Sequence, residues 1–368
     1  MSSPPEHLEP SQPTQPPLTY NCTPFQISSQ HAADLYQSGT KLWTPENLKS
    51  IESQLTSSLT LAFFTVQRLD GSIVRFQNPM FGVQKPIWKP RVKFQEYWHL
   101  VRSQPDGPAE IYNCTYLIEW INQTRQNYEG PIRIARELLE SGRKRWEESQ
   151  ICSAFVSRFR GLLIKSEQED RAAKKVTKLI CFGLGDLNFK PQDWWRIQNN
   201  AKEKEERQLE TSLIEGSVIH HAVALTMANV IRSCAKQGDE KLRLLTQDPQ
   251  YSAETKLLLQ ELGFEVVGDH GAGGFAELDD ESVVFSAFAK APVNQIIADI
   301  ARPVAIICPR KTGADTYNQF SKPQADAESP RTRQMWKEYD NWDFLPLSET
   351  LQTEGSLDRF AIYTGIKG

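Results

Sequence analysis

The sequence has few cysteines and no pair of them in the closely spaced CxxC arrangement of many metal and redox sites. Its six cysteines stand far apart, which argues against a zinc site built from closely spaced pairs. Cys181 and Cys308 fall within apolar segments, where a reduced thiol acts as a small hydrophobic side chain. We therefore expect reduced, unpaired thiols and no bound metal.

Long apolar runs and a strong charge imbalance are also lacking. We find no uninterrupted apolar stretch long enough for a membrane span, and residues 1–20 lack the basic start and apolar core of a secretory signal. The richness of this segment in Pro, Ser and Gln predicts a disordered tail. The net charge of −4 offers no basic field for nucleic acid or anionic lipid. We expect a cytoplasmic protein, with the nucleus as an alternative location, and leave a protein partner open.

The motifs of several enzyme classes are missing. The sequence has no nucleophile elbow, P-loop, zinc-protease helix motif or kinase motif set. Hydrolysis and phosphoryl transfer are therefore not indicated, no catalytic residue is assigned, and the sequence leans away from an enzyme.

Two helices and a hairpin are predicted near the N-terminus. Residues 30–39 suggest a short helix ended by glycine, and Thr44 followed by Pro45 suggests the N-cap of a second helix. Apolar residues of this second helix share one face: Leu48, Ile51 and Leu55. The Asp70-Gly71 pair between two β-rich runs predicts a hairpin.

The next part of the N-terminal half is expected to be irregular and then helical. Residues 79–108 are rich in proline and aromatics and predict irregular structure. Residues 116–128 suggest a helix, and a long helical stretch follows from Pro131, with Gly142 and Gly161 as points of interruption.

From Lys174 onward, short apolar strands alternate with helices. The predicted strands are 176–182, 242–247, 264–267, 282–288 and 303–308, and the predicted helices between them are 216–235, 253–262 and 293–300. This pattern predicts an α/β, Rossmann-like fold, with a mostly parallel sheet of about five strands and helices on both faces. An N-terminal α+β extension precedes it, and a late strand at 360–363 is expected to pack back on the sheet.

These patterns divide the chain into four parts. We expect a disordered tail at 1–20, an α+β region with the hairpin and long helix at 21–170, the Rossmann-like domain at 171–310, and a C-terminal segment packed on the core at 311–368.

The first candidate site combines a glycine turn with an aspartate. Gly183 and Gly185 follow the first strand, where glycine lets backbone N–H groups approach a phosphate or ribose. Asp248 ends the second strand, where a carboxylate can hold ribose hydroxyls. The third glycine of the dinucleotide fingerprint is missing, and a tight turn for the glycines and an Asp-Pro turn for Asp248 are the structural alternatives.

Three further features are weaker candidates. His220 and His221 lie on the helix after the first strand, where one is expected to face the crevice or to be a satisfied core histidine. The loop from Gly268 to Gly274 suggests a ligand loop or a plain surface loop. Cys308, before Pro309, is a candidate haem ligand, the least favoured of the three.

Four strings in this half resemble one known family. They are Lys178 to Asp186 (KLICFGLGD), His220 to Leu225 (HHAVAL), Gln247 to Tyr251 (QDPQY) and Leu258 to Phe264 (LLQELGF). In this order they are similar to the sensitivity-to-red-light-reduced family, most of all to its fungal branch, over roughly Val176 to Pro309.

The resemblance implies a Rossmann-like domain in a soluble protein. Plant members are linked to light signalling and the circadian clock, and others to haem biosynthesis and cytoskeletal phenotypes, without a defined reaction. This chain departs from the family in lacking the Pro-His-Cys run after the fourth strand, where it has Phe288 to Val293. His220 stands where a glutamine is common, so His221 is the closer match to the family pattern.

Three functions follow as hypotheses. The first is a regulatory, non-catalytic protein with a vestigial or ligand-sensing Rossmann crevice. The second is an enzyme of the methyltransferase-like or nucleotide-cofactor type, with S-adenosylmethionine or a nicotinamide nucleotide on Gly183 and Gly185 and its ribose at Asp248. The third, less favoured, is a haem-linked regulator that uses Cys308.

Overall fold

The structure is a computed structural model of the 368-residue chain. It describes residues 23–123, 135–168, 175–188, 191, 193–236, 241–310, 326–344 and 354–365. The tail predicted at 1–20 lies outside these residues.

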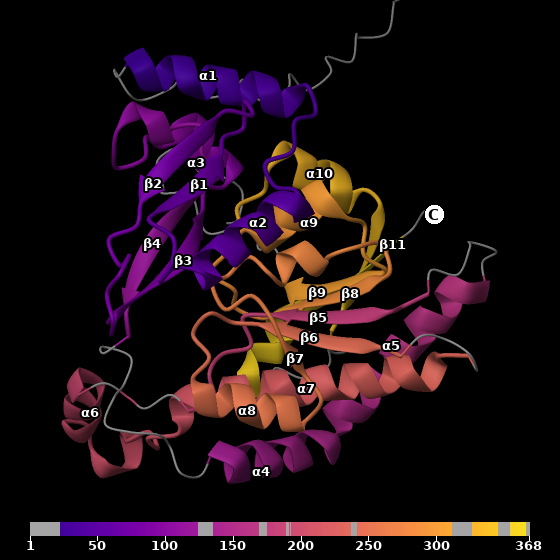
Figure 1. Cartoon of the computed structure of the whole chain (residues 1–368). Coiled ribbons are helices and arrows are strands. Elements are labelled where there is room, and N and C mark those ends of the chain that lie inside the picture. The colour runs from indigo at the N-terminus through magenta and orange to yellow at the C-terminus, as the bar shows by residue number, and fades with distance from the viewer. Residues whose placement is uncertain are drawn as a thin grey trace, which may run out of the picture.

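A seven-stranded, mostly parallel sheet forms the centre of the molecule, in the order β10-β11-β9-β8-β5-β6-β7 (Figure 1). Its strands are β5 (Lys178–Phe182), β6 (Arg243–Gln247), β7 (Glu265–Val266), β8 (Ser282–Ser286), β9 (Ala305–Pro309), β10 (Tyr339–Asp343) and β11 (Phe360–Gly365). Pairing is parallel from β9 to β7 and antiparallel between β9, β11 and β10.

All five predicted parallel strands are thus confirmed, and the sheet is wider than the sequence suggested. The late strand packs against β9 as expected, but β10 was not predicted. Its sequence, Tyr339 to Asp343, is mostly polar, as suits a strand at the edge of the sheet, and Asp340 and Asn341 are exposed.

The sheet is buried on both faces because its strands are apolar at consecutive positions. In β5, Leu179 and Cys181 belong to one hydrophobic cluster, and Ile180 and Phe182 belong to the other. Such strands suit a parallel sheet with a layer on each face. The molecule therefore has two cores separated by one sheet.

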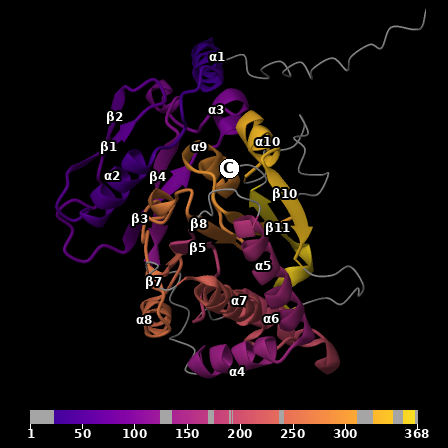
Figure 2. The ribbon, with the colours of Figure 1, turned by 90° about the vertical axis from the view of Figure 1, so that its right-hand side faces the viewer.

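Helices α4, α5, α7 and α8 lie on one face, and α2, α9 and α10 on the other (Figures 1 and 2). The helices are α1 (Thr23–Gln37), α2 (Pro45–Thr56), α3 (Tyr97–Arg102), α4 (Ala135–Glu147), α5 (Gln150–Gln168), α6 (Asp193–Asn200), α7 (Ser212–Cys234), α8 (Ala253–Glu261), α9 (Val293–Ile300) and α10 (Pro330–Trp336). The predicted crossover helices between the parallel strands are all present.

Helix α7 is the central helix of its layer. By length and composition it could cross a membrane, contrary to our reading of the sequence, but 78% of its apolar window is buried inside the protein. Its neighbours are the sheet and helices α4 and α5, so it is a core helix.

The break between α4 and α5 falls at residues 148–149, not at a glycine. Gly142 lies within α4, where a Cβ would come within 2.2 Å of Val218 on α7. It thus allows two helices to approach closely. Because α4 and α5 pack on α7, they belong structurally to the layer that covers the sheet.

The N-terminal region packs on the opposite face. Thr44 caps α2 as predicted, Leu48, Ile51 and Leu55 are buried, and the predicted hairpin is β1 (Phe63–Gln67) paired with β2 (Ile73–Gln77). Its apolar side chains join those of β5, β8 and β9 in a single cluster.

Two predictions for this region were wrong. The segment expected to be irregular contains β3 (Trp88–Phe94) and α3, and the helix predicted at 116–128 begins instead as β4 (Tyr116–Asn122), antiparallel to β3. Tertiary pairing with β3 explains this outcome, since the β-branched and aromatic residues of β4 suit a strand. The β3–β4 ribbon then reaches the carboxyl edge of the central sheet.

Candidate functional site

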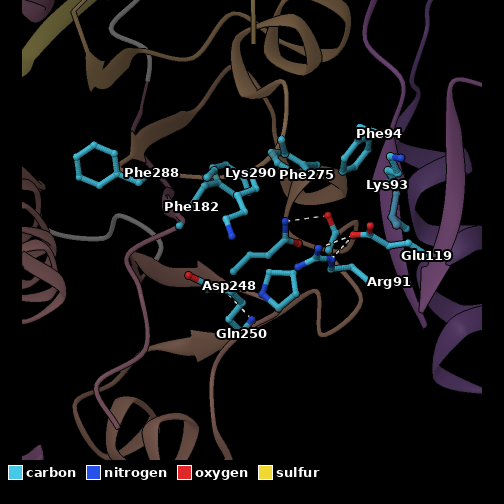
Figure 3. A pocket seen from close by; sticks show the side chains of 17 residues that line it. Arg91, Lys93, Phe94, Glu119, Phe182, Asp248, Gln250, Phe275, Phe288 and Lys290 are labelled. Atoms are coloured by element: carbon cyan, nitrogen blue, oxygen red, sulfur yellow. Dashed lines mark hydrogen bonds and ion pairs between the residues drawn. The ribbon is translucent and has the colours of Figure 1, made fainter. Parts of the chain in front are cut away.

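A cavity of about 250 Å³ lies at the carboxyl ends of β5, β6 and β8, between the sheet and the β3–β4 ribbon (Figure 3). In parallel sheets this edge is the usual place for a ligand. Its lining comes from the ribbon (Arg91, Val92, Lys93, Phe94, Glu119), from the ends of β5 and β6 (Phe182, Gly183, Gln247, Asp248, Pro249, Gln250), from the glycine-rich loop (Gly271, Phe275) and from the loop after β8 (Phe288, Ala289, Lys290, Ala291).

Gly183 lines the cavity, and its conformation requires glycine. Its φ is +64°, and a Cβ here would lie 2.3 Å from the backbone nitrogen of Ala289. Its N–H donates to the Gln247 carbonyl at 3.1 Å, and its carbonyl accepts from the Phe288 N–H at 3.1 Å. The close neighbour that requires glycine is therefore the loop after β8, without any need to invoke a phosphate.

Asp248 also lines the cavity, so the structure brings together two residues that the sequence placed in one site. Its Oδ1 accepts from the Gln250 N–H at 2.9 Å and its Oδ2 from the Gly185 N–H at 3.1 Å. Burial raises the pKa of Asp248, against the effect of these hydrogen bonds and of Lys290. The carboxylate thus links the β5 and β6 loops, while Ser252 caps the following helix.

Gly185 lies beside the site without lining the cavity. Its φ is +88°, and a Cβ would come within 2.1 Å of the Ser217 hydroxyl on α7. This glycine serves the close packing of α7 on the β5 loop. Its contribution to the site is the hydrogen bond that orients Asp248.

His221 is completely buried in α7 and does not line the cavity. Its Nδ1 lies 2.7 Å from the Ser217 carbonyl and its Nε2 lies 3.1 Å from the Tyr251 hydroxyl, which in turn contacts Thr246. Burial lowers the pKa of His221 to about 4, so the ring is neutral. Its observed contacts are those of a satisfied core histidine.

His220 takes a different position, among aromatic rings. It lies 5.4 Å from the ring of Phe288 and 5.9 Å from that of Phe360. Phe288 lines the cavity, so His220 contacts a lining residue without lining the cavity itself.

The glycine-rich loop, Gly268 to Gly274, already holds a carboxylate of the protein itself. Glu52 of α2 accepts from the N–H groups of His270 at 2.8 Å, Ala272 at 2.9 Å and Gly273 at 3.1 Å. Consecutive backbone N–H groups of this kind form an anion site. Here that site docks the N-terminal region onto the sheet.

The N-terminus of α9, next to the cavity, is likewise occupied. Asp326 accepts from the N–H of Asn294 at 3.0 Å and from that of Gln295 at 3.2 Å. A helix N-terminus stabilises a negative charge, and Asp326 provides it. Both backbone anion sites near the cavity are therefore filled by carboxylates of the chain.

The charged lining of the cavity was missed from the sequence. Arg91 and Glu119 face each other across the ribbon and form an ion pair, with Arg91 Nε donating at 2.6 Å. Lys93 lies on the same strand, and Lys290 lies on the loop after β8. Residues 88–94 alternate polar and apolar side chains in part, a signal that could have identified β3 and hence Arg91 and Lys93.

The aromatic wall of the cavity was also missed. Phe182 stacks on Phe275 with ring centroids 4.3 Å apart, and Phe94 meets Phe275 edge-on at 5.5 Å. Phe288 at the mouth is 52% exposed. Because Phe182 and Phe275 are each only 1% exposed, the aromatic surface open to a ligand is that of Phe94 and Phe288.

The cysteines lie apart from this site. Cys308 is buried within β9, opposite Ala361 of β11, and does not line the cavity, so its position lends the haem hypothesis no support. The five described cysteines form no disulfide with one another; Cys22 lies outside the described residues. Among the described residues we find no group of three His, Cys, Asp or Glu side chains suited to a metal.

One cavity is thus lined by charged side chains, by aromatic rings and by the polar ends of β5 and β6. A small molecule can bind there. Comparison of the chain with protein-family models, with curated proteins and with solved structures finds no match.

Proposed function

We propose that the chain is a ligand-sensing regulatory protein of the sensitivity-to-red-light-reduced type, built on a Rossmann-like domain. The observation that carries this proposal is that Gly183 and Asp248, from separate strands, line one cavity with the β3–β4 ribbon. In a doubly wound sheet, the crevice beyond the carboxyl ends of the strands is the expected ligand site.

The two walls of the cavity support a sensing role. One wall belongs to the central sheet, and the other, with Arg91 and Glu119, belongs to the N-terminal region. A bound molecule therefore contacts both parts at once. If the protein has two conformations that differ in how these parts meet, the molecule favours the conformation that it binds more tightly. A location in the cytoplasm or nucleus, and a protein partner that reads this change, belong to the same proposal.

The chemistry of the lining favours binding over conversion. Both oxygens of Asp248 already accept backbone hydrogen bonds, and the neutral ring of His221 lies outside the cavity. A general base needs to reach the proton that it removes. The lysines and the aromatic wall, in contrast, are suited to holding a molecule without changing it.

Ala291→Phe tests the proposal by filling the cavity from its own wall. We expect a panel of nucleotides, amino acids and organic acids to include a compound that raises the melting temperature of the wild type and is recovered unchanged by mass spectrometry. Ala291→Phe should lose this response, and Ala235→Phe, at an exposed position after α7, should keep it. Turnover of the compound, or an equal response from Ala291→Phe, would overturn the proposal.

A nucleotide-cofactor enzyme is the second candidate, because Asp248 and Gly183 share the cavity. If S-adenosylmethionine or a nicotinamide nucleotide binds with its ribose at Asp248, Asp248→Ala should weaken binding about tenfold, the equivalent of one charge-assisted hydrogen bond. Asp248→Asn, which can still accept from Gln250, separates ribose binding from loop structure. Flat calorimetric titrations with both cofactors would rule this candidate out.

A further inference from the structure

The cavity carries a surplus of positive charge. Three cationic side chains (Arg91, Lys93, Lys290) and two carboxylates (Glu119, Asp248) line it, which leaves a formal surplus of 3 − 2 = 1. Arg91 is paired with Glu119, and Asp248 is held by two backbone N–H groups. The positive charges that remain for a ligand are those of the two lysines.

Lys290 is the best placed of these cations. In the part of the chain that the structure describes, its ammonium group forms no hydrogen bond or ion pair, although it lies close enough to Asp248 to influence that carboxyl group. In Figure 3 its side chain lies between the aromatic residues and Asp248. An anion in the cavity would therefore meet an ammonium group that forms no ion pair or hydrogen bond with another described side chain.

The aromatic wall selects the rest of the ligand. Phe182 and Phe275 are stacked and almost fully buried, and Phe288 at the mouth keeps half of its surface in water. Covering such an exposed ring with an apolar group is favourable. A ligand with a flat apolar body can cover the exposed part of Phe288, two residues before Lys290 in the same loop.

Backbone recognition of a long phosphate chain is disfavoured here. The amides of the glycine-rich loop hold Glu52, and those of α9 hold Asp326. A dinucleotide is normally held by such amides at a glycine loop and helix N-terminus. The cavity instead offers side-chain cations, which suit one compact anionic group.

We infer that the ligand is a small organic acid: a flat apolar body that carries one carboxylate or phosphate monoester group, which pairs with Lys290. This inference rests on the proposed function and names the ligand class of the same cavity. Lys93 adds to the positive field from the opposite wall.

Three matched probes test the inference: 2-naphthoate, 2-naphthyl phosphate and the neutral 2-naphthamide. Calorimetry on the full chain should show at least one of the two acids binding about tenfold more tightly than the amide, the equivalent of a hydrogen bond between charged groups. Comparing the two acids identifies which anionic group the cavity prefers.

Lys290→Met should remove the preference for the acid and leave the affinity for the amide unchanged. Lys241→Met makes the same charge change at an exposed lysine near the opposite end of β6 and should keep the preference. Both positions are exposed, so neither variant is expected to lose its fold, and a melting curve verifies this.

Equal binding of acid and amide, or an acid preference retained in Lys290→Met, would overturn the inference. Suppose that the wild type shows one of these results and that Ala291→Phe binds none of the probes. The cavity then remains a ligand site, and only the inferred ligand class is wrong. The inference is also wrong if Ala291→Phe binds the probes as the wild type does, or if no probe binds the wild type. The proposed function is tested separately, by the compound panel described above.

Discussion

At the scale of single residues, backbone conformation fixes more of the site than side-chain chemistry does. Gly183 shapes the cavity through a positive φ and through its contact with the loop after β8, and it carries no functional group. The sequence could place this glycine at a turn, but the partner that requires it, Ala289, lies in a loop more than 100 residues away and became visible only in the fold.

Gly183→Ala should therefore destabilise the fold. The alanine would have to adopt a left-handed backbone conformation, and its Cβ would clash with Ala289. Together these effects should lower the free energy of unfolding by about 3 kcal/mol. Gly161→Ala is the control, because a Cβ there meets nothing within 4 Å inside helix α5, where it should be neutral or stabilise by up to about 1 kcal/mol. Equal urea midpoints for the two variants would contradict this reading.

A buried carboxyl group outside the cavity should give the protein a pH dependence. Glu96 accepts from Gln295 Nε2 at 2.6 Å, while its Oε1 lies 3.7 Å from His99 Nδ1. Burial, with a further contribution from Asp326, raises the pKa of Glu96 from 4.5 to about 8. Burial also lowers the pKa of His99, so this ring provides no positive charge at neutral pH.

Glu96→Gln tests this assignment. Between pH 4.5 and about 8 the unfolded chain loses the Glu96 proton and the folded chain keeps it, so the wild type loses stability as the pH rises. The variant keeps an acceptor for Gln295 and has no such proton. Its stability relative to wild type should increase across this window by at least about 1.4 kcal/mol, the equivalent of one pKa unit. Urea denaturation at pH 5 and pH 8 measures the difference, and a constant difference would refute the raised pKa.

At the scale of elements, the contact between α2 and the glycine-rich loop joins the N-terminal region to the sheet. Glu52 holds three N–H groups of the loop, and Gln247 holds the loop from the sheet side, with its Oε1 accepting from Gly274 at 2.6 Å. The sequence left this segment open between a ligand loop and a surface loop. Neither describes it fully, because its amides serve as a docking site inside the protein.

Glu52→Ala should release this contact. Three N–H groups would lose a charged acceptor, which should cost about 3 kcal/mol of unfolding free energy. Amide hydrogen exchange should rise selectively in residues 270–273, and Glu52→Gln, which keeps one acceptor oxygen, should give a smaller effect. Unchanged exchange in the loop of Glu52→Ala would show that the loop holds its form alone.

At the scale of the whole molecule, the N-terminal region and the sheet form one structural unit. Side chains of α1, α2 and the β3–β4 ribbon share a continuous core with β5, β8, β9 and α9. The boundary that the sequence suggested near residue 170 is therefore not a boundary between independent cores, since residues before it cover both faces of the sheet.

Unfolding should accordingly be a single transition. Far-UV and near-UV circular dichroism should give the same midpoint, because Trp43 and Trp146 are buried on opposite faces of one sheet. A fragment limited to residues 175–310 should be compact but without fixed side-chain packing, since one face of its sheet would be exposed to water. Two separated transitions in the full chain would mean that the two cores fold independently.

Elements with a local sequence pattern could be predicted, and elements that depend on tertiary pairing could not. The parallel strands and their helices were predictable because each is a local apolar pattern, and so were the positions of Gly183 and Asp248 at strand ends. The β3–β4 ribbon was not, because its strands owe their form to each other and to the sheet. Five of the 17 residues that line the cavity, Arg91 and Glu119 among them, were therefore missed as well.

The two edges of the sheet have a further consequence for the behaviour of the protein in solution. An open edge offers unpaired backbone groups on which another chain can add a strand. At one end β7 contributes only two residues, and at the other β10 carries Asp340 and Asp343 along a five-residue strand. Short and acidic edges of this kind oppose strand addition, so we expect these two edges to resist pairing with another chain.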